Sequence, residues 1–313
     1  MVNPFSGKRF SFGLGSLFQR RRPAVISSRS ALQLSALPGL KALLERPDSL
    51  PAGCAGFFLP APLQSGDLLV GRDKELEGLE TVFNGWQAGQ PASVAVVGPQ
   101  GCGKTSLINC FLEKRQQRWP ICRGVLGKRL KEEREVLEFF RGFFDVESGV
   151  EEVEALIARI GEREPRIIVL EGAHNLLLRV IGGRKALEIF MYVLLRTRRR
   201  HFWVLSCRRL PWLNMDRHVG ISRFFSHVLE LDLLPEERLR AALKLRLERC
   251  GLEVFFYRSR EELEQQRHQG ANEQEEKENG FFRALLANSG SNFYSALYFF
   301  LLCSRYEMKT QSL

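Results

Sequence analysis

The clearest chemical pattern in the chain is the segment VAVVGPQGCGKTSLI at 94–108. It has the spacing G-x-x-x-x-G-K-[ST], in which glycines let backbone N–H groups converge on an anion and the following helix directs its positive end at the same anion. Lys104 can reach the outer phosphates of a nucleotide, and the Thr105 hydroxyl can ligate Mg²⁺. We therefore expect a nucleoside triphosphate to be bound here by Gly98, Pro99, Gln100, Gly101, Cys102, Gly103, Lys104, Thr105 and Ser106.

A second chemical group is the carboxylate Glu171, which follows four apolar residues in PRIIVLEG at 165–172. A carboxylate at the end of a strand next to the phosphate loop can hold the Mg²⁺ shell or polarise a water molecule. The alternative is an acid that merely ends its strand in solvent. Because Leu170 and Gly172 flank Glu171, there is one acid and no adjacent second one. This pattern favours nucleotide binding over fast hydrolysis.

Two further residues follow the same logic. Ser206 ends the apolar segment HFWVLSC, where a polar side chain can contact the γ-phosphate or orient water, or simply cap the next turn. Arg223 precedes the segment SHVLELDLL and is a candidate arginine finger for a neighbouring subunit's nucleotide, or else a plain surface arginine. The catalytic candidates are therefore Lys104, Glu171, Ser206 and Arg223, and the metal candidates are Thr105 and Glu171.

The elements that must position these residues alternate between apolar, β-branched runs and helical stretches of ten or more residues. This alternation predicts βαβ units and a parallel sheet covered on both faces, an α/β fold. From Pro235 onward the pattern is helical only, apart from a polar insert. We expect a poorly structured, basic segment at 1–60, the nucleotide-binding core at 61–233, and a helical domain at 234–313 with its insert near 258–279.

Composition narrows the class of protein. The chain has 313 residues, 44% hydrophobic, with a formal net charge of +10, which excludes a wholly disordered or fibrous protein. No apolar run is long enough to cross a membrane, and FYSALYFFLLC at 293–303 is better interpreted as a buried helix. The seven cysteines are scattered and show no metal-ligand spacing, which favours reduced thiols in a cytoplasmic protein and disfavours a zinc site.

The positive charge is concentrated in two stretches. Residues 1–44 contain seven Lys or Arg and no acid, which is typical of a solvated tail, a polyanion-binding segment or an organellar transit segment. The second stretch includes RTRRRH at 196–201 and Arg208 with Arg209. These arginines could contact DNA phosphates, with an anionic membrane surface a weaker alternative, or could be balanced by acids at 261–278.

A resemblance to a known family rests on these motifs together. VGRDKELEGLE at 70–80 resembles the VGR-x-x-E-L box of AAA+ and STAND-type ATPases, and the similarity extends over roughly residues 66–310, closest to the initiator-like branch. The resemblance implies a parallel, five-stranded P-loop (ASCE-type) sheet followed by a C-terminal all-helical lid. It also implies ATP and Mg²⁺ as ligands, Glu171 as the strand-end acid, Ser206 as first sensor, Arg223 as finger, and contacts to the base from Val70, Gly71 and Arg72.

The lid segment departs from the family pattern. Tyr294 stands where the family often has a second sensor arginine, which leaves Arg246 and Arg305 as candidates. We expect an AAA+ ATPase that couples ATP hydrolysis to the assembly or remodelling of a macromolecular partner, acting as a homo-oligomer or with a partner protein. The alternative is a slowly hydrolysing switch or scaffold that signals through its lid. A small-molecule kinase is disfavoured by the VGR box and by the helical tail.

Overall fold

A computed structural model describes residues 9–13, 50–59, 61–130, 132–146, 152–176, 184–257 and 271–307. Most of the opening segment and the residues 258–270 of the polar insert therefore lie outside the described residues. The chain divides into two compact units, Leu63–Asp232 and a discontinuous unit made of Met1–Pro62 and Leu233–Leu313. Each unit is described below by itself.

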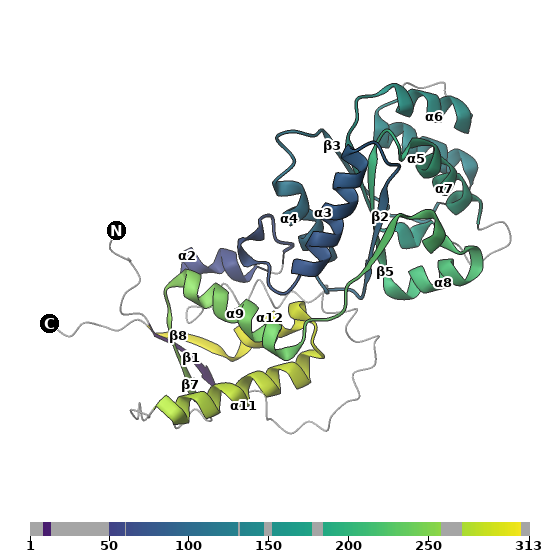
Figure 1. Ribbon diagram of the computed structural model, residues 1–313. Helices are drawn as coiled ribbons and strands as arrows, with labels where there is room; N and C mark the ends of the chain where they lie inside the picture. The colour runs from purple at the N-terminus through teal and green to yellow at the C-terminus, as the bar shows by residue number, and fades with distance from the viewer. Residues whose placement is uncertain are drawn as a thin grey trace. The chain divides into compact units, whose positions relative to one another are not determined.

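The unit 63–232 is built on a five-stranded sheet in the order β3-β4-β5-β2-β6 (Figure 1). Every neighbouring pair of strands is parallel, so the carboxyl ends of all five strands lie at one edge of the sheet and the amino ends at the other. The predicted five-stranded parallel sheet is confirmed. The strands are β2 (Ser93–Gly98), β3 (Ile121–Val125), β4 (Ile167–Glu171), β5 (Phe202–Arg208) and β6 (His227–Glu230).

Burial follows the position of each strand in the sheet. Every residue of β2 is buried, as are the first four of β4 and the first six of β5, because helices cover both faces of a parallel sheet. Consecutive side chains point to opposite faces, so Phe202 packs edge-on against Phe83 while Trp203 packs against Phe190 on the other side. The edge strand β3 is only partly buried, which is why it tolerates a charged residue, Arg123.

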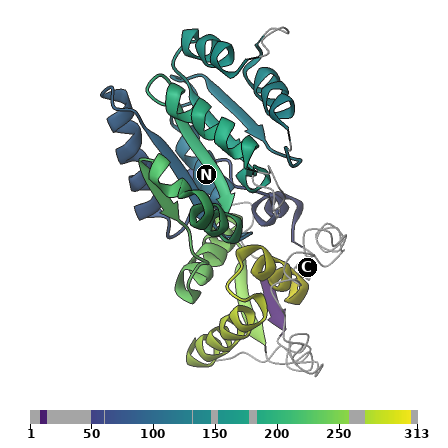
Figure 2. The ribbon, with the colours of Figure 1, turned by 90° about the vertical axis from the view of Figure 1, so that its right-hand side faces the viewer.

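Helices cover the two faces of this sheet: α3 and α4 lie on one face and α5 to α8 on the other (Figures 1 and 2). The α5 helix begins with a capping box, in which the side chains of Glu132 and Glu135 satisfy backbone N–H groups of the first turn. The helices are α3 (Asp73–Gln87), α4 (Lys104–Glu113), α5 (Glu133–Phe144), α6 (Val153–Glu162), α7 (Lys185–Thr197) and α8 (Arg209–Val219).

The discontinuous unit is mostly helical but not all-helical, which corrects the expected lid. It contains α2 (Ala52–Ala55), α9 (Glu236–Cys250), α11 (Ala271–Ser289) and α12 (Phe293–Cys303). It also contains a three-stranded sheet in the order β7-β1-β8, made of β7 (Glu253–Tyr257), β1 (Arg9–Gly13) and β8 (Ser304–Glu307). The central strand comes from the opening segment that we expected to be poorly structured, and it pairs with residues more than 240 positions away.

The apolar segment 293–303 is the helix α12, as expected. Its side chains at 295–297, 300, 301 and 303 are buried in an apolar cluster with residues of α9 and α11, including the stacked pair Phe58 and Phe300. Within the residues that the structure describes, no helix is both long enough and apolar enough to span a bilayer. The second half of the predicted insert forms the start of α11.

Candidate functional site

The predicted phosphate loop connects the end of β2 to the start of α4. Gly98 lies so close to its neighbours that an added Cβ would meet the Leu231 carbonyl oxygen at 2.5 Å and the Cys102 sulfur at 2.7 Å. Gly101 and Gly103 have φ angles of 80° and 94°, a left-handed conformation that side chains strongly disfavour. These three glycines therefore give the loop the tight bend from which α4 begins at Lys104.

Lys104 lies within the loop that it was predicted to serve. Its ammonium donates to the carbonyl oxygens of Gly98 at 2.9 Å and Pro99 at 2.7 Å, and it lies 3.8 Å from the Cys102 sulfur. Burial lowers the pKa of Lys104, while the neighbouring Cys102 acts in the opposite direction. The ammonium is thus held at the mouth of the loop by weak carbonyl acceptors, with no carboxylate bound to it among the described residues.

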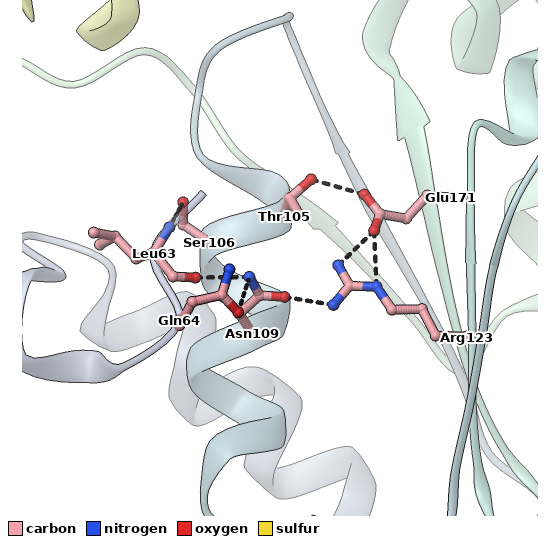
Figure 3. Close-up of polar contacts among 7 residues, drawn as sticks. All are labelled: Leu63, Gln64, Thr105, Ser106, Asn109, Arg123 and Glu171. Carbon is pink, nitrogen blue, oxygen red and sulfur yellow. Dashed lines mark hydrogen bonds and ion pairs between the residues drawn. The ribbon is translucent and has the colours of Figure 1, made fainter. Parts of the chain in front are cut away.

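Thr105 and Glu171 meet at the carboxyl edge of the sheet (Figure 3). The Thr105 hydroxyl donates to Glu171 Oε2 at 2.7 Å, which joins the first turn of α4 to the end of β4. A hydroxyl and a carboxylate are hard oxygen donors of the type that Mg²⁺ prefers, and both flank the phosphate loop. The residues present therefore fit the predicted pair of magnesium ligands, and each would offer an oxygen to a bound Mg²⁺.

The structure gives a physical reason for the missing second acid. Gly172 follows Glu171 with a φ of 78°, and an added Cβ would meet the Leu126 carbonyl oxygen at 2.8 Å. That backbone is fixed because Leu126 N–H donates to the Glu171 carbonyl oxygen at 2.8 Å. A carboxylate at position 172 would need both a strained backbone and a displaced neighbouring chain.

Sequence reasoning missed two residues of this site, Arg123 and Asn109. Arg123 Nε and Nη2 donate to Glu171 Oε1 at 3.1 and 2.5 Å, and Arg123 Nη1 donates to Asn109 Oδ1 at 2.7 Å (Figure 3). Asn109 lies on α4 and donates in turn to the Leu63 carbonyl oxygen at 2.7 Å. The available signal was the charged residue inside the expected strand ICRGV, but nothing in that pattern names its partner.

Arg72 of the predicted VGR box is hydrogen-bonded to the phosphate loop. Its guanidinium is 7% exposed and donates to Glu75 at 2.8 Å, to the Cys102 carbonyl oxygen at 3.0 Å and to the Asp232 carbonyl oxygen at 2.5 Å. Val70 and Gly71 precede it, and Gly71 has a φ of 68°. The box is therefore tied directly to the loop, and a contact with the base stays a prediction for these three residues.

The remaining candidates divide between the two edges of the sheet. Ser206 is buried on β5 directly beside Glu171 in the β4–β5 register. Ser106 lies on α4, where its Oγ accepts from Leu63 N–H at 3.1 Å. Arg223 lies just before β6, at the amino edge of the sheet, so the structure does not bring it together with the phosphate loop of its own chain.

The last three candidates are His174, three residues after Glu171, and the two arginines proposed as second sensor, Arg246 and Arg305. Burial, and then Arg208, Lys104 and Arg129, lower the pKa of His174, so its ring is neutral near pH 7. Arg246 is buried in the discontinuous unit, where it stacks on Phe293 and donates to the carbonyl oxygens of Phe57 and Ala242, and burial lowers its pKa to about 10. The side chain of Arg305 lies outside the described residues.

The basic stretch around β5 is split by the strand itself. RTRRRH precedes β5, whereas Arg208 and Arg209 lie where it ends, about 20 Å away for a strand of this length. The arginines before β5 gather at the amino edge with those before β3 and β4, since Arg200 Nε donates to the Arg163 carbonyl oxygen at 3.0 Å. We call these the amino-edge arginines: Arg118, Arg163, Arg166, Arg196, Arg198, Arg199 and Arg200.

None of the amino-edge arginines forms an ion pair with a carboxylate within the residues that the structure describes. Glu162 and Glu164 lie in the same region, but the ion pair of Glu162 is with Arg159 on its own helix. Arg199 and Arg200 are exposed. Two arginines at the carboxyl edge differ, since Arg209 pairs with Glu230 and Asp232 and Arg123 pairs with Glu171.

Comparisons with known proteins agree with this architecture. Residues 68–204 match the family model described as the AAA ATPase domain, a span that contains the loop, Glu171 and most of the sheet. No curated protein matches the sequence significantly.

The solved structures that are similar to the chain include three proteins. They are the ORC2 protein of Aeropyrum pernix in ADPNP–ADP complexes (14% identity, TM-score 0.48, 61% of this chain and 55% of that one), Cdc6p of Pyrobaculum aerophilum (14%, 0.49, 64% and 54%) and a RuvB variant of Thermotoga maritima (15%, 0.45, 77% and 63%). The chain thus spans little more than half of the first two proteins, and likeness at this level supports no conclusion about ligand or activity.

The family match and the described fold agree on the same segment of the chain. The match covers less than half of the 313 residues, so it characterises a domain and not the whole protein. Within that segment, a parallel sheet, a glycine-bent loop and a helix that starts at Lys104 form the P-loop arrangement. Residues 68–204 therefore match the AAA ATPase domain model in sequence and contain the loop, helix and strands of this arrangement.

Proposed function

We propose that this protein binds Mg-ATP at the loop 98–105 and hydrolyses it to drive assembly or remodelling of a macromolecular partner. The observation that carries the proposal is the hydrogen bond of 2.7 Å between Thr105 and Glu171, which brings two magnesium-type ligands together beside the loop. When bound, Mg²⁺ would neutralise and order the phosphates. Lys104 and the backbone amides of the loop would bind and orient the outer phosphates, and Glu171 would hold the Thr105 hydroxyl and the metal shell.

A slowly hydrolysing switch is the second candidate, and Gly172 favours it. The backbone at this position leaves no room for a second carboxylate, so Glu171 alone would have to serve both metal and water. Ser206, next to Glu171 in the sheet register, is the remaining polar group proposed to contact the γ-phosphate or its water. Turnover of the wild-type chain separates the two candidates, because a motor hydrolyses many ATP molecules per minute and a switch stays loaded.

Binding of ATP is the direct test of the shared part of both candidates. We expect Lys104→Ala to weaken ATP binding by about 100-fold, since one charge-assisted contact to phosphate is lost. Lys114→Ala is the matched control, because Lys114 is an exposed lysine that ends the same helix. Titration calorimetry with the full chain measures both variants, and equal affinities for Lys104→Ala and wild type would overturn the proposed function.

Arg223 concerns the proposed assembly of several copies of the chain. We propose that it acts on the nucleotide of a neighbouring copy, because it is exposed and lies at the edge of the sheet opposite its own loop. Arg223→Ala should then lower turnover in an oligomer of confirmed mass. Unchanged turnover in that oligomer would discard this role, and a monomeric wild type with full activity would do the same.

For the partner, the amino-edge arginines favour the phosphate backbone of DNA. Arginine side chains that lack a carboxylate partner can form bidentate bonds to phosphate, and several along one edge suit an extended polyanion. A membrane surface is the weaker alternative because apolar anchors are sparse there: Tyr192, 37% exposed, is the one large exposed hydrophobic side chain within the described residues of this edge. Retention of duplex DNA should fall steeply as salt rises, and a flat salt response would exclude this surface as the site.

A further inference from the structure

The two oxygens of the Glu171 carboxylate are bound by two different donors. Oε2 accepts from Thr105, whereas Oε1 accepts two bonds from the fork of Arg123 (Figure 3). The Glu171 side chain is 15% exposed, whereas that of Arg123 is 33% exposed. The carboxylate oxygen that Thr105 leaves open is thus held by a guanidinium of this chain.

Arg123 is fixed in this position from two sides. Its third nitrogen, Nη1, donates to Asn109 Oδ1 at 2.7 Å, and the Asn109 amide is itself held by the Leu63 carbonyl oxygen at 2.7 Å. A planar guanidinium that is already ordered loses little further side-chain entropy in each bond it makes. The ion pair is therefore a preformed part of the site.

His174, three residues after Glu171, lies in a cationic field. After burial, the charges of Arg208, Lys104 and Arg129 are what lower the pKa of His174, and all three act at the same edge of the sheet. Such a field attracts a triphosphate but repels a divalent cation, because Coulomb energy scales with the product of the charges. A guanidinium on Glu171 adds to that repulsion and competes for the same oxygen.

We propose that Arg123 is a resident cation of the nucleotide site, which shares the Glu171 carboxylate with Mg²⁺ and sets how strongly nucleotide binding depends on the metal. The proposal rests on the function proposed above and makes it more specific. In the wild-type chain, Arg123 and Lys104 supply part of the positive charge that a bound Mg²⁺ would otherwise supply to the phosphates. ATP therefore binds almost as well without the metal as with it. Removing Arg123 frees Glu171 for Mg²⁺ and makes binding metal-dependent.

Titration of ATP into the full chain, in excess Mg²⁺ and in excess EDTA, tests this inference. For wild type we expect the two dissociation constants to agree within about threefold, and for Arg123→Gln to differ by more than about tenfold, the worth of one charge-assisted hydrogen bond. The sign is specific, because Arg123→Gln should weaken binding in EDTA and strengthen it in Mg²⁺. Arg123→Lys restores the charge without the planar fork, so the ratio of the two dissociation constants should fall between those of wild type and Arg123→Gln.

Arg208→Gln is the matched control. It removes the same charge from the same edge, but Arg208 is bonded to no carboxylate within the described residues. ATP binding should therefore weaken in both buffers, and the ratio of the two dissociation constants should stay as in wild type. If Arg123→Gln behaves like Arg208→Gln, this inference is wrong while the proposed function stands. If wild type binds no ATP in either buffer, both the proposed function and this inference are wrong. Should Arg123→Gln fail to fold, Asn109→Ala releases the anchor of Arg123 and should raise the ratio in the same direction.

Discussion

The two edges of the central sheet are both rich in arginine and lysine, but they hold these side chains differently. At the carboxyl edge, three cations beside the loop are bound within the site: Lys104 to loop carbonyls, Arg72 to Glu75 and two carbonyls, and Arg123 to Glu171 and Asn109. At the amino edge, none of the seven arginines has a carboxylate partner among the described residues, and five of them donate only to neutral carbonyl or hydroxyl oxygens.

This difference separates two ways of binding phosphate. A small ligand that must be oriented needs donors in fixed positions, so its cations are held by neighbouring groups before it arrives. A long polyanion gains mainly from releasing counterions, which requires many accessible charges and little geometry. The carboxyl edge therefore suits a nucleotide, and the amino edge suits an extended backbone.

The largest expected effect comes from reversing charge at the amino edge. Arg199→Glu combined with Arg200→Glu should weaken duplex DNA binding by about 100-fold at low salt, because two phosphate contacts become repulsive. The affinity for ATP should stay within about twofold of wild type. Lys104→Ala should do the reverse, with ATP binding lost and DNA binding kept, as measured by fluorescence anisotropy and calorimetry.

A pair of exposed arginines on α9, Arg238 and Arg249, provides the control for net charge. Changing both to Glu alters the charge by the same amount in the other unit. If this variant loses as much DNA affinity as the amino-edge variant, the effect comes from overall charge and the contrast between the two edges disappears.

The rigidity of the carboxyl edge is tested at Gly172. Gly172→Ala should destabilise the protein by about 2–3 kcal/mol, because alanine disfavours a positive φ and its Cβ meets the Leu126 carbonyl oxygen. Gly161→Ala, in α6 with no atom within 4 Å of the added Cβ, should change stability by less than about 1 kcal/mol and in the stabilising direction. Urea unfolding of both variants measures the difference. Equal stabilities would mean that the turn after Glu171 is adaptable and that a second acid could be placed there.

The smallest effect concerns His201, a buried residue at the amino edge. Burial lowers its pKa to about 4, and Arg166 and Arg200 act in the same direction. Between that value and the ordinary pKa of about 6.5, the unfolded chain binds a proton that the native chain does not, so stability should fall by about 1 kcal/mol as the pH drops from about 7 to about 5.5. His201→Gln should remove this dependence, as measured by urea unfolding near neutral and mildly acidic pH. An unchanged pH profile in His201→Gln would show that other groups cause it.

Much of the sheet could be predicted from the sequence because its signals are local. The runs SVAVVG, IIVLE and FWVLSC are apolar and β-branched, and each is buried as a central strand. The phosphate loop was equally legible, since its glycines and Lys104 act through the spacing of consecutive residues. The order of the strands in the sheet is visible only in the three-dimensional structure. The same holds for the placement of RTRRRH and of Arg208 with Arg209 at opposite edges of the sheet.

The rest depended on partners that are distant in sequence. RFSFG lies in a basic segment that is typical of a solvated tail, and only its pairing with residues 253–257 and 304–307 makes it a strand. In the sequence, Arg123 is an ordinary charged residue of an edge strand. Its partner Glu171 lies 48 positions later, so the sequence pattern around Arg123 does not predict their ion pair. Similarly, the conformation of Gly172 is set by Leu126, which no local pattern reveals.

The strand β1 has a consequence for the order in which the chain becomes structured during synthesis. Residues 63–232 are contiguous, so this unit can fold once they have left the ribosome. The sheet β7-β1-β8 must wait for residues 304–307, while the opening segment that supplies its central strand has been exposed throughout translation. A waiting strand with unpaired N–H and C=O groups is prone to pair wrongly, so nascent copies are most exposed to misassembly until residues 304–307 have been synthesised.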